Sequence, residues 1–185
     1  MIQRLALCFA LFLAPAWTAG ELSNRRAPGF SLPDRNIKQH DLADYRGKVV
    51  LLEIMLTTCP HCVTSSKTLD RISRKYPGRV QALAIVNPPD TTASVSRFIQ
   101  EHGISYPILF DSGQAAASYM MATPQKSGFA VPHLFVIDQN GTIRSDYSHS
   151  FLTLSIFEGQ GLFEEVEKLL GGGAAKKAAS KKAAK

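Results

Sequence analysis

The chain has 185 residues, of which 45% are hydrophobic, so its length and composition fit one compact domain with a hydrophobic core better than two. Its formal net charge is +6, but residues 171–185 carry five lysines and residues 1–20 carry Arg4 as their one charged side chain. The central body is therefore neutral overall, and the basic composition does not predict a nucleic-acid partner.

The first 20 residues have the pattern of a secretory signal peptide. Arg4 supplies a positive start, Leu5 to Ala14 is almost unbroken apolar sequence, and small residues follow. This run is too short to span a bilayer comfortably, so we expect cleavage rather than a retained anchor. Cys8 lies inside the run and is assigned to the discarded peptide. We therefore expect a mature domain over residues 21–170, exported to the periplasm or cell envelope.

Strand and helix patterns alternate along this domain. Apolar or β-branched runs bounded by turn residues predict strands at residues 27–32, 37–42, 48–56, 80–86, 108–110, 133–138 and 142–147. Apolar residues at helical spacing predict helices at residues 62–76, 91–102, 114–121 and 161–170. Asn140-Gly141 indicates that the last two strands form a hairpin. This order predicts an α/β fold with a central mixed, mostly parallel sheet flanked by helices, and an N-terminal β-hairpin extension.

The C-terminal segment 171–185 contains only Gly, Ala, Lys and one Ser. Such a composition cannot build a core, so we expect disorder. The segment is either a solvated extension or a cationic arm for an anionic envelope surface, on which its Lys and Ala residues suit a transient helix.

The motif Cys59-Pro60-His61-Cys62 follows a buried strand and opens a helix. Unpaired backbone N–H groups and the positive end of the helix dipole favour a thiolate there, so we expect Cys59 to be the exposed nucleophile. Cys62 lies one turn inside the helix and is expected to be more buried and to resolve a mixed disulfide. His61 can stabilise the thiolate further, and Pro60 suits the first turn of a helix.

The short spacing of the two cysteines favours reversible chemistry. A structural disulfide stabilises a protein mainly by closing a long loop, which this pair does not do. A four-thiolate zinc site needs a second cysteine pair that the chain lacks. We therefore expect a redox-active Cys59–Cys62 disulfide with no metal and no other cofactor.

Five segments together resemble the TlpA/ResA-like branch of the thioredoxin superfamily, within the redoxin/AhpC-TSA group. They are residues 27–32, 46–51, 59–62, 131–132 and 135–143. The resemblance covers about residues 27–170 and implies a thioredoxin fold. It also implies an exported or membrane-tethered oxidoreductase that acts on protein thiols or disulfides with an envelope electron-transfer partner. Many members of that family keep cytochrome c apoprotein thiols reduced.

The resemblance assigns roles to three further residues. It implies that Pro132 is a cis-proline beside the dithiol, where the neighbouring backbone of Val131 is free to pair with a substrate strand; an ordinary trans proline is the alternative. Glu53, the only charge between Val49 and Thr58, would be a buried acid that moves a proton to or from Cys62. The alternative is a Glu53 that points to a sheet edge and is solvated.

Two departures from the family pattern leave the direction of electron flow open. Thr58 precedes the dithiol where the family usually has Trp, and His133 follows the proline where it usually has Thr. The Pro-His dipeptide is also that of the strongly oxidising DsbA proteins. His133 is expected near the cysteines, either as a satisfied structural residue, as a tuning residue, or with Cys59, Cys62 and His61 as a ligand of a soft metal such as copper. The other three histidines are expected to be ordinary surface or loop residues: His40, His102 and His149.

Two other functions compete with disulfide exchange. A copper-binding or metallochaperone module would use Cys59, Cys62 and His133, although related Sco-type proteins have a wider CxxxC spacing. A thiol peroxidase would place Thr and Pro ahead of its reactive cysteine, where this chain has Leu56 and Leu52. No dimerisation segment is evident, so we expect a monomer.

Overall fold

A computed structural model describes residues 20–183 of the chain. The predicted signal peptide, with Cys8, therefore lies outside the described residues apart from Gly20. Within residues 20–183, no helix combines the length and the apolar composition that a membrane crossing requires.

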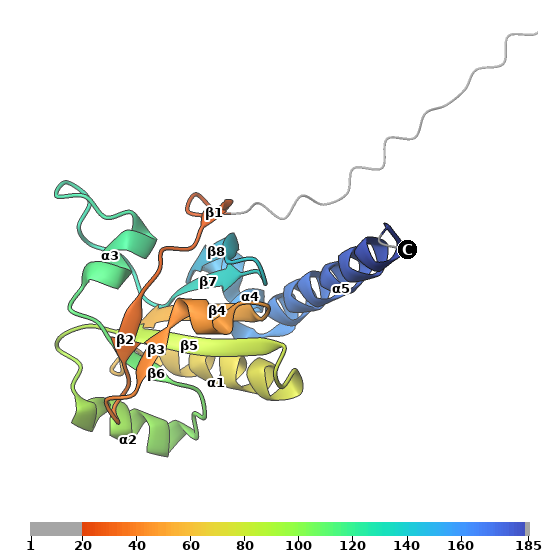
Figure 1. The fold of residues 1–185 in the computed structure, drawn as a ribbon. Coiled ribbons are helices and arrows are strands. Elements are labelled where there is room, and N and C mark those ends of the chain that lie inside the picture. The colour runs from red at the N-terminus through yellow and green to blue at the C-terminus, as the bar shows by residue number, and fades with distance from the viewer. Residues whose placement is uncertain (1–19, 184–185) are drawn as a thin grey trace, which may run out of the picture.

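A six-stranded mixed sheet forms the centre of the domain (Figure 1). Its strands are β1 (Arg25–Arg26), β4 (Val49–Met55), β5 (Val80–Val86), β6 (Ile108–Phe110), β7 (His133–Ile137) and β8 (Thr142–Ser148), in the order β1-β8-β7-β4-β5-β6. The pairs β4·β5 and β5·β6 are parallel, whereas β4·β7, β7·β8 and β1·β8 are antiparallel. The prediction of a mostly parallel sheet is therefore wrong. The β7–β8 hairpin pairs with central β4 in the antiparallel sense, and β1 adds a further antiparallel pair.

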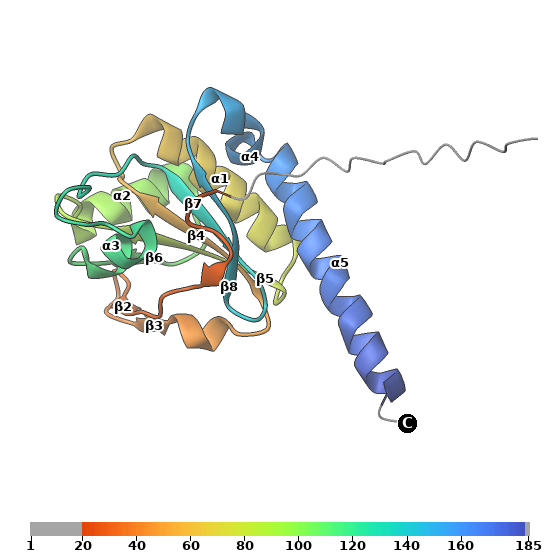
Figure 2. The same ribbon diagram turned by 90° about the horizontal axis from the view of Figure 1, so that it is seen from above.

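Helices cover both faces of this sheet. One face packs against α1 (Pro60–Lys75), α2 (Thr92–His102), α4 (Leu154–Glu158) and α5 (Gln160–Ala183). The other face packs against α3 (Gln114–Met120) and the N-terminal segment. Figure 2 shows α1, α4 and α5 on the opposite side of the sheet from α3. The predicted α/β architecture with helices on both faces is confirmed.

Side chains alternate strictly between these faces along the central strands. On β4, Leu51 and Met55 belong to the core under α1, whereas Leu52 and Ile54 belong to the opposite core. Glu53 lies between Leu51 and Met55 in this alternation and so faces α1. On β7, Leu134 faces the α1 side; His133 therefore faces the opposite side.

The structure also contains elements that the sequence did not predict. The N-terminal hairpin of β2 (Ser31–Pro33) and β3 (Gln39–Asp41) was expected, but β1, α4 and two 3-10 helices, η1 (Leu42–Tyr45) and η2 (Phe151–Thr153), were not. The helix α5 continues to Ala183, where disorder was expected (Figures 1 and 2). Ala and Lys are strong helix formers, and this preference outweighs the glycines at its middle.

Candidate active site

The two cysteines of the motif lie where β4 ends and α1 begins. Cys59 is the N-cap of α1, with an extended backbone (φ −86°, ψ 118°), and Pro60 is the first helical residue. Cys59 is partly exposed, whereas Cys62 is fully buried, and both are free thiols. The N–H of Cys62 donates to the carbonyl of Cys59 at 3.1 Å. An incoming partner can therefore reach Cys59 and not Cys62.

The Cys62 thiol is held in its protonated form by its surroundings. Burial raises the pKa of Cys62 well above its usual range, and the negative charge of Glu53 raises it further. Cys62 therefore becomes a nucleophile only when a nearby base removes its proton.

Glu53 is the nearby carboxyl group. It is fully buried in β4, opposite Ala84 of β5 and Leu134 of β7. Burial raises the pKa of Glu53 to about 7, and the hydroxyls of Ser65 and Ser66 oppose that rise. A carboxyl group with such a pKa can accept or release a proton near neutral pH.

The carboxyl group of Glu53 is only partly hydrogen-bonded. Ser66 Oγ donates to Glu53 Oε2 at 2.9 Å. Across residues 20–183, Glu53 Oε1 has no partner of hydrogen-bond geometry, and neither do the neighbouring hydroxyls of Ser65 and Tyr106. A proton on Oε1 is therefore not tied to a fixed acceptor.

The loop before β7 borders the exposed thiol. The peptide bond between Val131 and Pro132 is cis, as the resemblance implied. The Cys59 thiol donates a long hydrogen bond to the Val131 carbonyl, with Sγ and O 3.8 Å apart. Val131 is partly exposed and Pro132 is buried, so the backbone beside Cys59 is open to a partner.

His61, in the middle of the motif, is exposed and stacks on a histidine that the sequence did not single out. The rings of His61 and His149 have centroids 4.1 Å apart and planes inclined at 24°. Burial lowers the pKa of His149, and the charge of His61 lowers it further. His149 follows β8, and no local sequence signal places it beside the motif, because 87 residues separate the two histidines.

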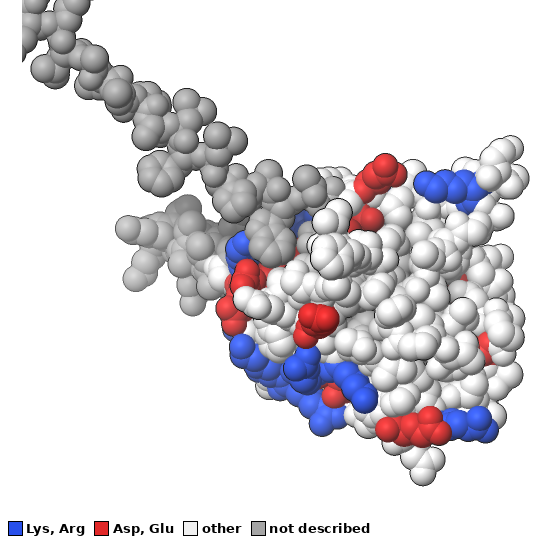
Figure 3. Space-filling view, turned by 180° about the vertical axis from the view of Figure 1, so that it is seen from behind, with Lys and Arg blue, Asp and Glu red and all other residues white. Residues whose placement is uncertain are grey.

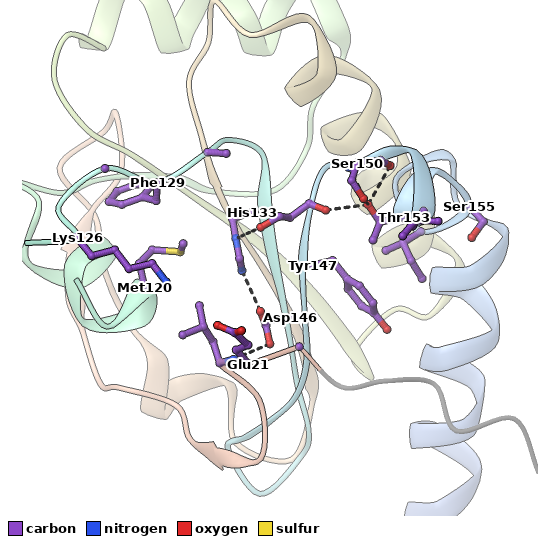
Figure 4. Close-up of a pocket in the computed structure, with 17 residues that line it drawn as sticks. Glu21, Met120, Lys126, Phe129, His133, Asp146, Tyr147, Ser150, Thr153 and Ser155 are labelled. Atoms are coloured by element: carbon purple, nitrogen blue, oxygen red, sulfur yellow. Dashed lines mark hydrogen bonds and ion pairs between the residues drawn. The ribbon is translucent and has the colours of Figure 1, made fainter. Parts of the chain in front are cut away.

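His133 lies away from the cysteines, on the opposite face of the sheet. Its Nδ1 is 3.0 Å from Ser148 Oγ and its Nε2 is 3.3 Å from Asp146 Oδ2 (Figure 4). Although burial acts to raise it, the nearby His133 ring and a hydrogen bond from Ser23 hold the pKa of Asp146 below its usual value. The expectation that His133 tunes the thiolate is therefore not supported. His133 is a buried residue whose Nδ1 is hydrogen-bonded to Ser148, whereas its Nε2 lies near the Asp146 carboxylate without hydrogen-bond geometry among the described residues.

His133 and Asp146 line a cavity of about 810 Å³ (Figure 4). The cavity lies between the segment before Val131 and the segment after β8, with Phe129, Met120 and Lys126 on its walls. None of the residues that line it is a cysteine.

The proposed copper ligands do not form a cluster. Within the described part of the chain, no group of three or more His, Cys, Asp or Glu side chains is arranged to hold a metal ion. Cys62 and His133 point to opposite faces of the sheet, which explains why these two residues cannot share a metal with Cys59.

The other two histidines differ from each other. His40 is buried, with Nδ1 2.7 Å from Tyr45 Oη and Nε2 3.2 Å from Asp34 Oδ2, so the expectation of a surface residue is wrong. His102 is partly exposed and packs edge-on against Phe98, far along α2 from the motif.

Asp90, which no sequence pattern marked as part of the site, holds the loop that leads into Cys59. Its Oδ2 accepts from the N–H of Thr57 at 3.0 Å, and its Oδ1 accepts from Ser94 Oγ at 2.8 Å and from Thr57 Oγ1. Its position just before the Thr91 N-cap marks a helix start, but gives no sign of a bond to a loop 33 residues earlier.

Known proteins resemble this chain in sequence and in structure. The profile of the AhpC/TSA family matches residues 24–146. The thiol-disulfide oxidoreductase ResA of Geobacillus kaustophilus is 29% identical over 118 residues, which cover 64% of this chain and 64% of ResA. The thioredoxin-like protein YneN of Bacillus subtilis is 24% identical over 127 residues, covering 68% of this chain and 71% of YneN.

A solved structure supports the fold. A thiol:disulfide interchange protein of the thioredoxin family from Chlorobium tepidum superposes with a TM-score of 0.64 at 18% identity, covering 79% of this chain and 96% of that one. The predicted thioredoxin fold is therefore confirmed, whereas the chain spans only about 64% of the length of ResA.

Proposed function

The chain belongs to the AhpC/TSA family, and from this premise we propose that it is a thiol–disulfide oxidoreductase that exchanges disulfides with protein substrates. The observation that carries the proposal is the arrangement of one partly exposed and one buried cysteine at the start of α1, with a buried carboxyl group behind the second. The name of ResA supports the same activity.

In the reducing direction, the Cys59 thiolate attacks a substrate disulfide and releases the first substrate thiolate. The Glu53 carboxylate then takes the proton of Cys62. The Cys62 thiolate attacks Cys59 Sγ, which releases the second substrate sulfur and leaves a Cys59–Cys62 disulfide. Oxidation of a substrate dithiol follows the same steps in reverse, with Glu53 returning the proton to Cys62.

The Val131 carbonyl supports the same reaction from the other side. It lies 3.8 Å from Cys59 Sγ, so a substrate strand that pairs with the Val131 backbone brings its own sulfur to Cys59. Pro132 sets the course of the chain there, and His61 contributes positive charge near Cys59.

The cellular setting follows from the sequence. The signal pattern of residues 1–20 supports export. The resemblance to the TlpA/ResA-like branch supports an envelope electron-transfer partner and a role in cytochrome c maturation or general envelope redox homeostasis. We propose a monomer with no cofactor beyond the Cys59–Cys62 disulfide, and a lysine-rich end that contacts anionic surfaces. No observation favours the copper or peroxidase alternatives.

Trapping tests the proposal. In Cys62→Ala the resolving thiol is absent, so mixed disulfides through Cys59 should accumulate with envelope proteins and disappear on treatment with dithiothreitol. Cys59→Ala is the matched control and should trap nothing. Wild-type protein should also catalyse reduction of insulin. Absence of both trapped partners and insulin reduction contradicts the proposal.

A further inference from the structure

Three aromatic rings connect the core to the exposed histidine of the motif. Phe157 of α4 is 2% exposed and packs against the ring of His149, with centroids 5.2 Å apart. His149 in turn stacks on His61 at 4.1 Å, with the planes inclined at 24°. The exposed ring of His61 is thus supported from the interior through His149.

The backbone of His149 contacts a second border of the dithiol. Its N–H donates to the carbonyl of Pro132 at 3.3 Å. One residue therefore contacts both the start of α1, through its ring, and the loop beside Cys59, through its backbone. The segment after β8 is placed by these two contacts.

We propose that His149 is a positioning residue for the dithiol: it holds the imidazole of His61 at the start of α1, where the ring stabilises the Cys59 thiolate and so favours the reduced form. This inference rests on the proposed function. An exposed side chain that samples several rotamers stabilises a neighbouring charge less than one held in place.

Charge on the two rings is consistent with this role. Burial and the charge of His61 both lower the pKa of His149, which disfavours a positive charge on the ring that stacks on His61. Contact between an aromatic face and a cation at an exposed site changes an equilibrium by about two- to fivefold. Among the described residues, the aromatic rings that pack against the His149 ring are His61 from α1 and Phe157 from α4.

The experiment measures the equilibrium of the Cys59–Cys62 couple with reduced and oxidised glutathione. His149→Ala should shift this equilibrium about two- to fivefold toward the disulfide, because the thiolate loses support. His149→Phe retains a stacking ring and should restore the wild-type value. His102→Ala is the matched control, since His102 also packs on an aromatic ring but lies in α2.

A double-mutant cycle isolates the effect that passes through His61. In a His61→Ala background, His149→Ala should cause no further shift. An equal shift in both backgrounds, no shift in wild type, or no restoration by Phe overturns the inference while leaving the proposed function intact. If His149→Ala does not fold, the test uses His149→Phe instead. The inference is overturned if the glutathione equilibrium of His149→Phe is shifted from wild type as far as that of His61→Ala. A wild-type protein that forms no Cys59–Cys62 disulfide overturns both proposals.

Discussion

The proposed proton transfer depends on one residue, a carboxyl group in the middle of a central strand. Glu53 is fully buried, and its carboxylate accepts a hydrogen bond from Ser66. Burial raises the pKa of Cys62, and the negative charge of Glu53 raises it further. Protonation of Glu53 therefore removes a charge that disfavours the Cys62 thiolate.

Replacing Glu53 by Gln should change how stability depends on pH. Burial raises the pKa of Glu53 from 4.5 to about 7 on folding. Between these values the folded state holds a proton that the unfolded chain has lost, so this contribution to stability is complete below pH 4.5 and is lost as pH rises through 7. Because Gln does not titrate, the stability of Glu53→Gln does not fall in this way as pH rises.

The measurement is the free energy of unfolding in urea for both reduced proteins. The free energy of unfolding of Glu53→Gln minus that of wild type should increase by about 3 kcal/mol between pH 4.5 and pH 8. The comparison between variant and wild type cancels the other carboxyl groups. A difference that stays constant over this range contradicts a buried, raised Glu53.

The same substitution should slow disulfide exchange. Gln cannot accept the proton of Cys62, so insulin reduction at pH 7 should fall by roughly a hundredfold, the lower end of the usual effect of a general base. Glu101→Gln, at an exposed position of α2, is the matched control and should leave the rate unchanged. A Glu53→Gln protein with the wild-type rate argues against the proton relay.

The connection between β4 and α1 is the element that places Cys59. Asp90 holds this loop from the start of α2 through bonds to Thr57. Asp90→Ala should therefore destabilise the protein by about 1 kcal/mol, since it leaves the partly buried donors of Thr57 and Ser94 without this partner. Denaturation in urea measures this loss, and Asp44→Ala, at an exposed position, provides the comparison. Equal stability of the two variants contradicts the role of Asp90.

Many elements could be predicted because their signals are local. The apolar run at residues 48–56 became β4, and the Thr91 cap and Gly103 at positive φ bound α2 where the sequence placed it. The buried Glu53 and the dithiol could be found because one charge interrupts an apolar strand and two cysteines open a helix. These features depend on neighbours within one turn or one strand.

The missed features depend on partners that are distant in sequence. Arg25 and Arg26 form β1 only because Ile143 and Thr142 of β8 lie beside them. The stack of His149 on His61 requires the return of β8 to the start of α1. His133 was expected near the cysteines because it follows Pro132, but the alternation of side chains along β7 turns it to the other face.

At the scale of the whole molecule, cations and anions lie side by side on the face that Figure 3 shows. Most of its Lys and Arg side chains gather at the lower left of the view, and Asp and Glu side chains lie beside them. On α1, Arg74 Nε is 2.6 Å from Asp70 Oδ2, and Lys75 Nζ is 3.3 Å from Glu167 Oε1 of α5. Acidic partners thus accompany these two cations of α1.

The end of α5 should be dispensable for folding. Among residues 160–171 of this helix, Leu162, Val166 and Leu170 are buried hydrophobic side chains. Residues 172–185 consist of Gly, Ala, Lys and one Ser, a composition that cannot build a core. Deletion of residues 172–185 should leave the unfolding free energy and insulin reduction unchanged, and should abolish sedimentation with vesicles of anionic phospholipid. Vesicles of phosphatidylcholine alone are the control. Loss of folding on deletion, or unchanged sedimentation with anionic vesicles, contradicts this division of roles.

The whole account depends on the difference between the two thiols, which alkylation of the native reduced protein measures most directly. Brief treatment with iodoacetamide at pH 7, followed by peptide mapping, should find Cys59 modified and Cys62 unmodified. Cys62 should become reactive only after unfolding in guanidinium. Equal modification of both thiols, or faster modification of Cys62, would contradict the assignment of Cys59 as the nucleophile.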